Sequence, residues 1–285
     1  MFIDEACIGC IINQSRKVSH AIKADEKLTN RLVSHVEEMS KSFSYTQTPP
    51  AIAADVYEQM AQIAGKIDLY DEVKEHSTQK ALSCVPLLKE ELAKSTNKLL
   101  SATKIAVAGN VIDLAAEVEF DLHEELEKIF HTPFAHDDFD AFKEQLSHAK
   151  KVVVIGDNAG EHIFDHLFIE TLQNLYSHAE FTYMVRGCAI INDVTMQEAI
   201  EAGFDKLCNL VDSGVNTPGF TYERATSHAK ELFDSADLII SKGMGNYECM
   251  TPPRRKNICF LLKVKCGVVA ASLGKNIGDI ICKLS

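Results

Sequence analysis

Two carboxylates and an amide in this sequence have the chemistry of a divalent-metal site. Asp157 and Asn158 directly follow a short β-branched run, and Asp193 follows a second apolar run. Carboxylate and amide oxygens are ligands that Mg²⁺ and Mn²⁺ take in proteins, with water at the remaining positions. Asp and Asn are also preferred helix caps, so the same residues could serve only to begin the helices that follow. The residue types leave both interpretations open.

Two lysines have the chemistry of a phosphate site. Lys242 and Lys265 follow two neighbouring predicted strands, and Gly243 and Gly245 come soon after the first lysine. Ammonium groups attract phosphate, and glycines let backbone N–H groups approach it closely. A single loop lysine is usually only solvated. The acidic strand ends predicted beside these lysines leave phosphate binding and simple solvation as two open interpretations.

A Cys-x-x-Cys pair near the start of the chain offers a third chemistry. Cys7 and Cys10 have the spacing of half a zinc or redox site. A tetrahedral zinc site needs two further ligands, for which Cys84 and His20 are the candidates. The alternative is two ordinary thiols on the first turn of a helix.

Other polar residues and motifs indicate no further site. The group His131, His136, Asp137 and Asp138 is interpreted as a solvated connection. The sequence has no Gly-x-Gly-x-x-Gly, Walker, Gly-x-Ser-x-Gly or His-Glu-x-x-His pattern. A nucleotide cofactor is therefore not favoured.

The predicted elements bring the polar residues to one edge of a sheet. After about residue 149, short apolar runs alternate with helical stripes, which predicts an α/β fold with a mostly parallel sheet between two helical layers. Ligands bind at the carboxyl ends of the strands in such sheets, where polar or glycine-rich residues stand here. The predicted strands are 151–155, 181–185, 207–211, 238–240 and 258–262, with 268–272 as a further candidate, and the predicted helices are 163–175, a short one from the capping box of Thr195 and Glu198 to Gly203, and 222–235.

The N-terminal third of the chain predicts helices only. Apolar residues recur at three-and-four spacing over 18–39, 52–63 and 73–92, and Pro86 should kink or restart the last of these helices. We therefore expect an all-helical N-terminal subdomain over residues 1–100 and an α/β catalytic domain over 101–285.

Composition excludes several classes of partner. The 285 residues are 46% hydrophobic and 25% charged, as in ordinary globular proteins, and the net charge of −12 disfavours binding to nucleic acid or to anionic membranes. No window reaches 18 apolar residues, so we expect no transmembrane helix. Acidic residues near the start argue against a signal peptide, and nine scattered cysteines are expected to be reduced thiols of a cytoplasmic protein. The sequence predicts no oligomeric state.

Five ordered motifs together resemble one protein family, the metal-dependent damage-control phosphatases, formerly a domain-of-unknown-function family. The Cys-x-x-Cys pair and the chain length resemble its prokaryotic branch. The motifs are Gly109-Asn110-Val111-Ile112-Asp113, Asp157-Asn158-Ala159-Gly160-Glu161, Arg186-Gly187 with Asn192-Asp193-Val194-Thr195, Asp212-Ser213-Gly214, and Lys242-Gly243-Met244-Gly245-Asn246-Tyr247-Glu248.

The resemblance implies a helical part packed on a three-layer α/β domain, and a cleft that binds a small phosphorylated metabolite. It implies that Asp157, Asn158 and Asp193 hold a divalent cation (Mn, Co, Ni or Mg), with Lys242 and Lys265 near the phosphate. By the same resemblance the helical part reaches the cleft through Gly109, Asn110 and Asp113, and the other substrate-binding residues are Glu161, Arg186, Ser213, Gly214, Gly243 and Asn246.

The activity implied is hydrolysis of small phosphomonoesters such as sugar phosphates and related damaged or side-product metabolites. A metal-activated water is the expected nucleophile, with Asp193 or Asp113 as proton acceptor, although direct attack by Asp157 is also open. The rival functions are an S-adenosylmethionine-dependent carboxyl methyltransferase, a non-catalytic phosphometabolite-binding protein, and a cysteine-based metal or redox module. Arg186 occupies the position where the methyltransferase would need an acid.

Overall fold

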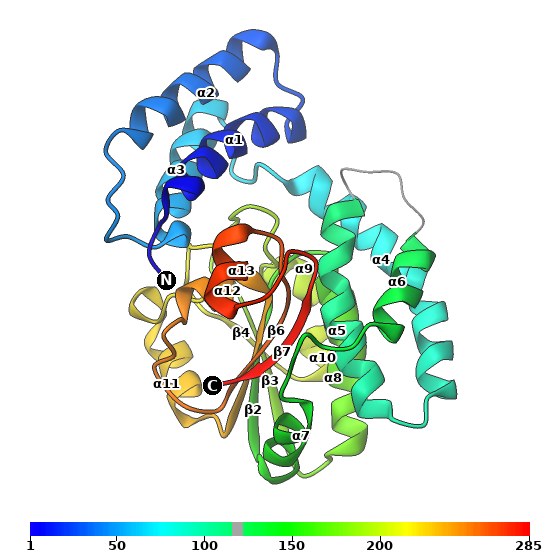
Figure 1. Ribbon diagram of the computed structural model, residues 1–285. Helices are drawn as coiled ribbons and strands as arrows, with labels where there is room; N and C mark the ends of the chain where they lie inside the picture. Colours follow the sequence, from blue (N-terminus) through cyan, green and yellow to red (C-terminus); the bar gives the residue numbers. More distant parts are fainter. Residues whose placement is uncertain (116–121) are drawn as a thin grey trace.

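A seven-stranded sheet forms the centre of the computed structural model (Figure 1), which describes residues 1–115 and 122–285, and side chains outside 110–126. The strand order is β1-β7-β6-β5-β2-β3-β4. Strands β2 to β6 run parallel, whereas β7 runs antiparallel to β6. The mostly parallel α/β fold is therefore confirmed. The strands are β1 (His136–Asp137), β2 (Lys151–Ile155), β3 (Glu180–Val185), β4 (Asn209–Asp212), β5 (Leu238–Lys242), β6 (Ile258–Lys263) and β7 (Ile280–Leu284).

Helices cover both faces of the sheet because its central strands are apolar on both sides. Along β2, Val152 and Val154 belong to one hydrophobic core, and Val153 and Ile155 belong to the other. The first core is closed by α4 (Asp71–Lys94), α5 (Lys98–Ala115), α7 (Phe139–His148), α8 (Glu161–Leu175), α9 (Met196–Glu201) and α10 (Phe204–Leu207). The second is closed by α11 (Ser227–Ser235), α12 (Gly243–Cys249) and α13 (Gly267–Leu273). Helix α6 (Leu122–His131) also contributes to the first core, through Ile129.

Three N-terminal helices lie beyond one end of the sheet, in blue at the top of Figure 1. They are α1 (Glu5–Ala21), α2 (Glu26–Ser40) and α3 (Pro49–Ala64), and they pack on one another around Val18, Leu32, Val36, Val56 and Met60. Helix α4, by contrast, packs into the first core of the sheet. The predicted domain division at residue 100 stays a prediction.

Three of the predicted helices differ from the structure. The run 18–39 is two helices, because Asp25 caps a new helix through its side chain. Pro86 lies inside the single helix α4 and does not restart it. Helix 222–235 is a 3₁₀ turn (Tyr222–Arg224) followed by α11, with Thr226 as its cap.

The prediction of a strand over 268–272 is wrong, since these residues form α13. Cys266 caps its start through the side chain, and Gly274 ends it in the left-handed conformation. A short apolar run fits either a strand or a buried helix turn, so periodicity could not separate them. The seventh strand, β7, follows α13 in the chain and was not predicted.

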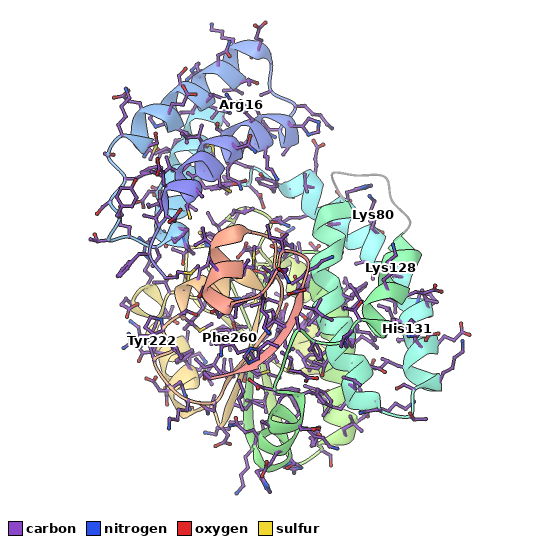
Figure 2. The ribbon with its side chains drawn as sticks, viewed as in Figure 1. Arg16, Lys80, Lys128, His131, Tyr222 and Phe260 are labelled. Atoms are coloured by element: carbon purple, nitrogen blue, oxygen red, sulfur yellow. The ribbon has the colours of Figure 1, made fainter. Side chains whose placement is uncertain are left out.

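The connection around residue 136 is also less solvated than predicted. His136 and Asp137 form β1 and pair with β7 at the edge of the sheet. His131 is the exposed last residue of α6, whereas Phe260 on β6 packs edge-on against Tyr247 in the interior (Figure 2). In the described part of the chain, no helix is both long and apolar enough to span a bilayer.

Candidate active site

The sheet changes direction of winding between β2 and β5, and the candidate site begins there. The chain goes from β2 to β3 and β4 on one side, then returns to place β5 on the other side of β2. At such a switch point the loops leaving the two strands diverge, which opens a crevice at their carboxyl ends. Asp157 leaves β2 at this point, and Gly243 leaves β5.

Backbone pairing brings the three predicted metal ligands together. Asn158 and Asp193 form an isolated antiparallel bridge, and the N–H of Val194 donates to the carbonyl of Asp157 at 2.9 Å. The side-chain amide of Asn158 donates to Asp157 Oδ2 at 3.1 Å, which leaves the amide oxygen to face a cation. The structure thus joins residues 36 positions apart in the chain into one group of oxygen donors.

These residues line a cavity of about 750 Å³ between the sheet and the N-terminal helices. A cavity of this size suits a small metabolite. Lys265, one of the two predicted phosphate-binding lysines, lines the same cavity as the three oxygen donors. Helices α1 and α3 supply much of the opposite wall, including Cys7, Cys10 and Tyr57.

The electrostatics of Asp157 favour a cation at this position. Burial raises the pKa of Asp157 well above its ordinary value, and the neighbouring carboxylates Glu161 and Asp193 raise it further. Arg186 and Lys265 act in the opposite direction but do not cancel the shift. A bound divalent cation would stabilise the ionised carboxylate, so the donor set fits a metal of the kind that oxygen ligands select.

Arg186 and Asn246 lie under the wall that carries the three predicted metal ligands and hold it in place. Arg186 Nε donates to Asp193 Oδ2 at 2.7 Å, and its Nη2 donates to Asn246 Oδ1 at 3.2 Å. The Asn246 amide in turn donates to the carbonyls of Gly156 at 3.0 Å and Lys242 at 2.6 Å. Both residues were predicted to bind substrate, but they are buried and do not line the cavity.

Lys242 lies in a buried ion cluster and not in the cavity. Its Nζ is 2.5 Å from both Glu161 Oε1 and Asp165 Oδ1, and all three side chains are fully buried. Burial lowers the pKa of Lys242, but Asp165 and Glu161 outweigh that effect and hold the pKa above its usual value. Burial raises the pKa of Glu161 to about 7, with Lys242 opposing the shift. The structure thus places Lys242 and Glu161 behind the cavity wall.

The other predicted residues lie at different distances from the cavity. Ser213 and Gly214 follow β4, where the Ser213 hydroxyl accepts from the Val215 N–H, and neither lines the cavity. Gly109 on α5 lets that helix approach Glu161, because a Cβ there would lie 2.5 Å from Glu161 Cγ. The side chains of Asn110 and Asp113 lie outside the described residues.

The zinc alternative for the cysteines finds no support in the described side chains. Among these residues, no group of three or more His, Cys, Asp and Glu could hold a metal ion. Cys84 is buried in the core under the sheet, while Cys7 and Cys10 line the cavity. The two thiols therefore belong to the wall of the candidate active site.

Replacing Gly243 with alanine should displace Asp157, one of the three predicted metal ligands. The backbone of Gly243 has φ +75°, and a Cβ at this position would lie 1.8 Å from Asp157 Oδ2. The left-handed conformation costs a non-glycine residue about 1–2 kcal/mol, and a displaced carboxylate costs about 10²-fold in rate. We expect both losses in unfolding and phosphate-release measurements. Gly9→Ala, with open space around its Cβ, is the control that should retain wild-type rates.

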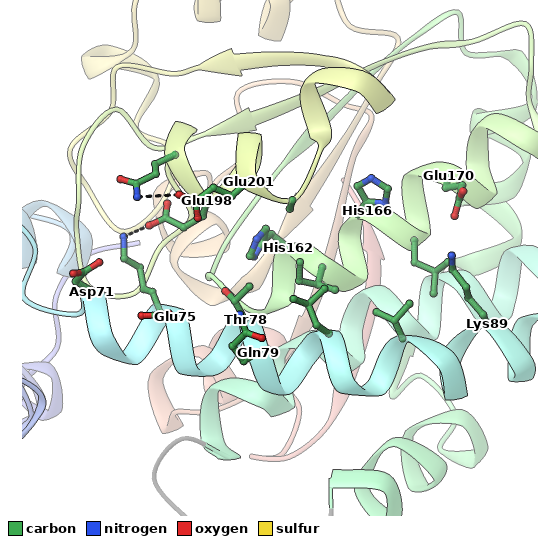
Figure 3. A pocket seen from close by; sticks show the side chains of 17 residues that line it. Asp71, Glu75, Thr78, Gln79, Lys89, His162, His166, Glu170, Glu198 and Glu201 are labelled. Carbon is green, nitrogen blue, oxygen red and sulfur yellow. Dashed lines mark hydrogen bonds and ion pairs between the residues drawn. The ribbon is translucent and has the colours of Figure 1, made fainter.

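A second cavity, of about 640 Å³, lies between α4, α8 and α9 (Figure 3). Acidic residues outnumber lysines in its lining, and Asp71, Glu75 and Glu170 are among the acids that Figure 3 labels. None of the predicted site residues lines it. At its floor, His162 accepts a hydrogen bond from the Gly160 N–H at 2.9 Å and so holds the start of α8.

His162 should stay neutral far below the ordinary histidine pKa. Burial lowers its pKa to about 4, with Glu198 opposing the shift. We expect no change in the His162 ring signal by NMR between pH 8 and about 5, with the signal assigned from a His162→Gln variant. Since the folded pKa lies below the unfolded one, His162 should contribute less to stability as the pH falls from about 6.5 to 4. An NMR titration midpoint near pH 6.5 for this ring would contradict the burial of His162.

Comparisons with known proteins agree with the fold and the motifs. The family described as the damage-control phosphatase ARMT1-like domain matches residues 3–281. A damage-control phosphatase of Pyrococcus horikoshii is 30% identical over 99% of this chain and 98% of its own length, and one of Archaeoglobus fulgidus is 29% identical over 100% and 99%. A crystal structure of a DUF89 family protein from Pyrococcus horikoshii superimposes with a TM-score of 0.91 at 28% identity, covering 100% of this chain and 99% of the other.

Proposed function

This chain belongs to the ARMT1-like family of damage-control phosphatases, and on that premise we propose that it is a metal-dependent phosphatase of small phosphomonoester metabolites. The observation that carries the proposal is the meeting of Asp157, Asn158, Asp193 and Lys265 at one cavity of metabolite size. Sugar phosphates and related damaged or side-product phosphometabolites are the proposed substrate class.

Asp157, Asn158 and Asp193 would hold the divalent cation, which supplies Lewis acidity to a phosphate oxygen and lowers the pKa of an attacking water. Lys265 would neutralise the negative charge on the phosphoryl oxygens while the phosphoryl group is transferred. Arg186 orients Asp193 through the hydrogen bond from Nε to Oδ2 at 2.7 Å. Asp193 would then accept the proton of the nucleophile.

Two features of the site separate this proposal from its rivals. Behind the cavity wall, Arg186 directly follows β3 and is an ion-paired cation where a methyltransferase of this fold would place an acid for the ribose. The cavity also contains an acidic group able to bind a cation, which a simple phosphometabolite-binding protein does not need. Titration with S-adenosylmethionine should therefore give no binding.

The direct test is phosphate release from a panel of small phosphomonoesters with Mn²⁺, Co²⁺, Ni²⁺ or Mg²⁺. We expect metal-dependent turnover that chelation removes and readdition of the cation restores. Tight binding of several phosphomonoesters with no release under any of these metals would favour the non-catalytic alternative. A phosphorylated Asp157, found by mass spectrometry after an acid quench, would favour attack by that carboxylate over attack by water.

A further inference from the structure

The wall of the cavity opposite the metal ligands contains one fixed amide. Helices α1 and α3 contribute mainly apolar groups there, among them Ile11, Pro50 and Ala53. Gln14 and Tyr57 are the exceptions, and the buried phenol of Tyr57 donates to Gln14 Oε1 at 3.1 Å. Because this bond commits the amide oxygen, the two N–H donors of Gln14 are left for a molecule in the cavity.

The Gln14–Tyr57 pair lies close to the metal-binding wall. Both residues line the cavity that contains Asp157 and Asp193. Burial and Tyr70 raise the pKa of Tyr57 well above its ordinary value, and Asp193 adds to the shift. A phosphate held by Lys265 and by a cation at the two aspartates would therefore leave the organic part of its ester within the cavity that Gln14 also lines.

The charges around the cavity limit what the organic part can carry. Asp4 and Glu248 line it in addition to the two metal-binding aspartates. Among the described residues of the lining, Lys265 is the cationic side chain, and the phosphoryl group needs it. A second phosphate or a carboxylate on the substrate would meet acids and no counter-charge, whereas a hydroxyl or a carbonyl group would meet the amide donors.

We propose that Gln14, oriented by Tyr57, recognises an uncharged oxygen on the organic part of the substrate and so makes the N-terminal helices the specificity element of this enzyme. The inference rests on the proposed phosphatase function and deepens it. It assigns the chemistry to the sheet edge and the choice of substrate to α1 and α3. An amide whose orientation is already fixed loses little entropy on binding, so it discriminates well between oxygen-bearing and apolar groups.

The test compares Gln14→Leu with the wild type on hydroxylated monophosphates (glucose 6-phosphate, ribose 5-phosphate, glycerol 3-phosphate) and on phenyl phosphate. Leucine keeps the bulk of the side chain but removes its donors. We expect the ratio of kcat/KM for the best hydroxylated substrate to that for phenyl phosphate to fall about tenfold, through KM, which corresponds to one lost hydrogen bond. Tyr57→Phe should lower the ratio less. Asn13→Leu, at an exposed neighbouring position on α1, is the matched control and should keep the wild-type ratio.

A second measurement, of binding, tests the inference without relying on turnover. Isothermal titration with the same monophosphates and with glucose 1,6-bisphosphate should show weaker binding of the bisphosphate by the wild type, and about tenfold weaker binding of the monophosphate by Gln14→Leu. If no probe is hydrolysed but this pattern of binding appears, the phosphatase proposal fails and the specificity role stands. An unchanged ratio and unchanged binding in Gln14→Leu, or no binding of any hydroxylated monophosphate by the wild type, would overturn the inference.

Discussion

Replacing Asp157 with asparagine will lower phosphate release by about 10³-fold or more while leaving the protein folded. The carboxylate is buried beside Glu161 and Asp193, so without a cation its charge is unfavourable and its pKa lies well above the ordinary value. Asparagine resembles the protonated acid in shape and removes that repulsion. We therefore expect a free energy of unfolding at least equal to that of the metal-free wild type.

Metal binding separates this expectation from a general loss of structure. Mn²⁺ should raise the melting temperature of the wild type, because a ligand that binds only the folded state stabilises it. It should not raise that of Asp157→Asn. Asp205→Asn, a control at an exposed carboxylate on α10, should respond to Mn²⁺ as the wild type does. A fully active Asp157→Asn variant would remove Asp157 from the metal site and from the mechanism.

Replacing Lys242 with methionine will destabilise the protein by about 3–5 kcal/mol, the usual loss when one partner of a buried ion pair is removed. The ammonium group neutralises Glu161 and Asp165, each 2.5 Å away and fully buried. Tyr183 also donates to Asp165 at 3.0 Å, so the cluster ties β5 to α8 and β3. Without Lys242, two carboxyl groups lose their counter-charge in the interior. Chemical denaturation measures the loss.

A combined variant tests whether the ion cluster is the cause. Lys242→Met together with Glu161→Gln and Asp165→Asn removes all three charges, and it should recover at least half of the lost stability. The same variant tests the predicted contact of Lys242 with phosphate. If it folds, binds Mn²⁺ and hydrolyses phosphomonoesters, Lys242 acts through structure. If it folds and binds Mn²⁺ but releases no phosphate, the predicted role near the phosphate is supported. If Lys242→Met were as stable as the wild type, the ion cluster would not have the stabilising role given to it here.

Much of the candidate site could be predicted because its residues follow strands. Short apolar runs identify the strands locally, and parallel strands bring their carboxyl ends to the same edge. Asp157, Asn158, Asp193 and Lys265 were therefore predictable as neighbours, although the last of them follows a strand more than a hundred residues after the first. The backbone bridge between Asn158 and Asp193 follows from the same geometry.

Gln14 and Tyr57 could not be found in this way. Each lies on an amphipathic helix of the N-terminal part, and nothing in its own segment distinguishes it from the other polar residues of that helix. Their place over the active site depends on how α1 and α3 fold back across the sheet edge. To find these two residues one would have to know which distant segments pack together. A single sequence does not contain that information.

The amino-acid sequence by itself determined the alternation of strands and helices, the edge of the sheet where ligands bind, and the oxygen donors that stand there. These features depend on local periodicity and on the rule that parallel strands end together. Only the tertiary structure decided that Lys265 faces the cavity while Lys242 is buried against Glu161 and Asp165. Two lysines that follow neighbouring strands look alike in sequence, but burial and counter-charge come from α8, so the fold alone separates their roles.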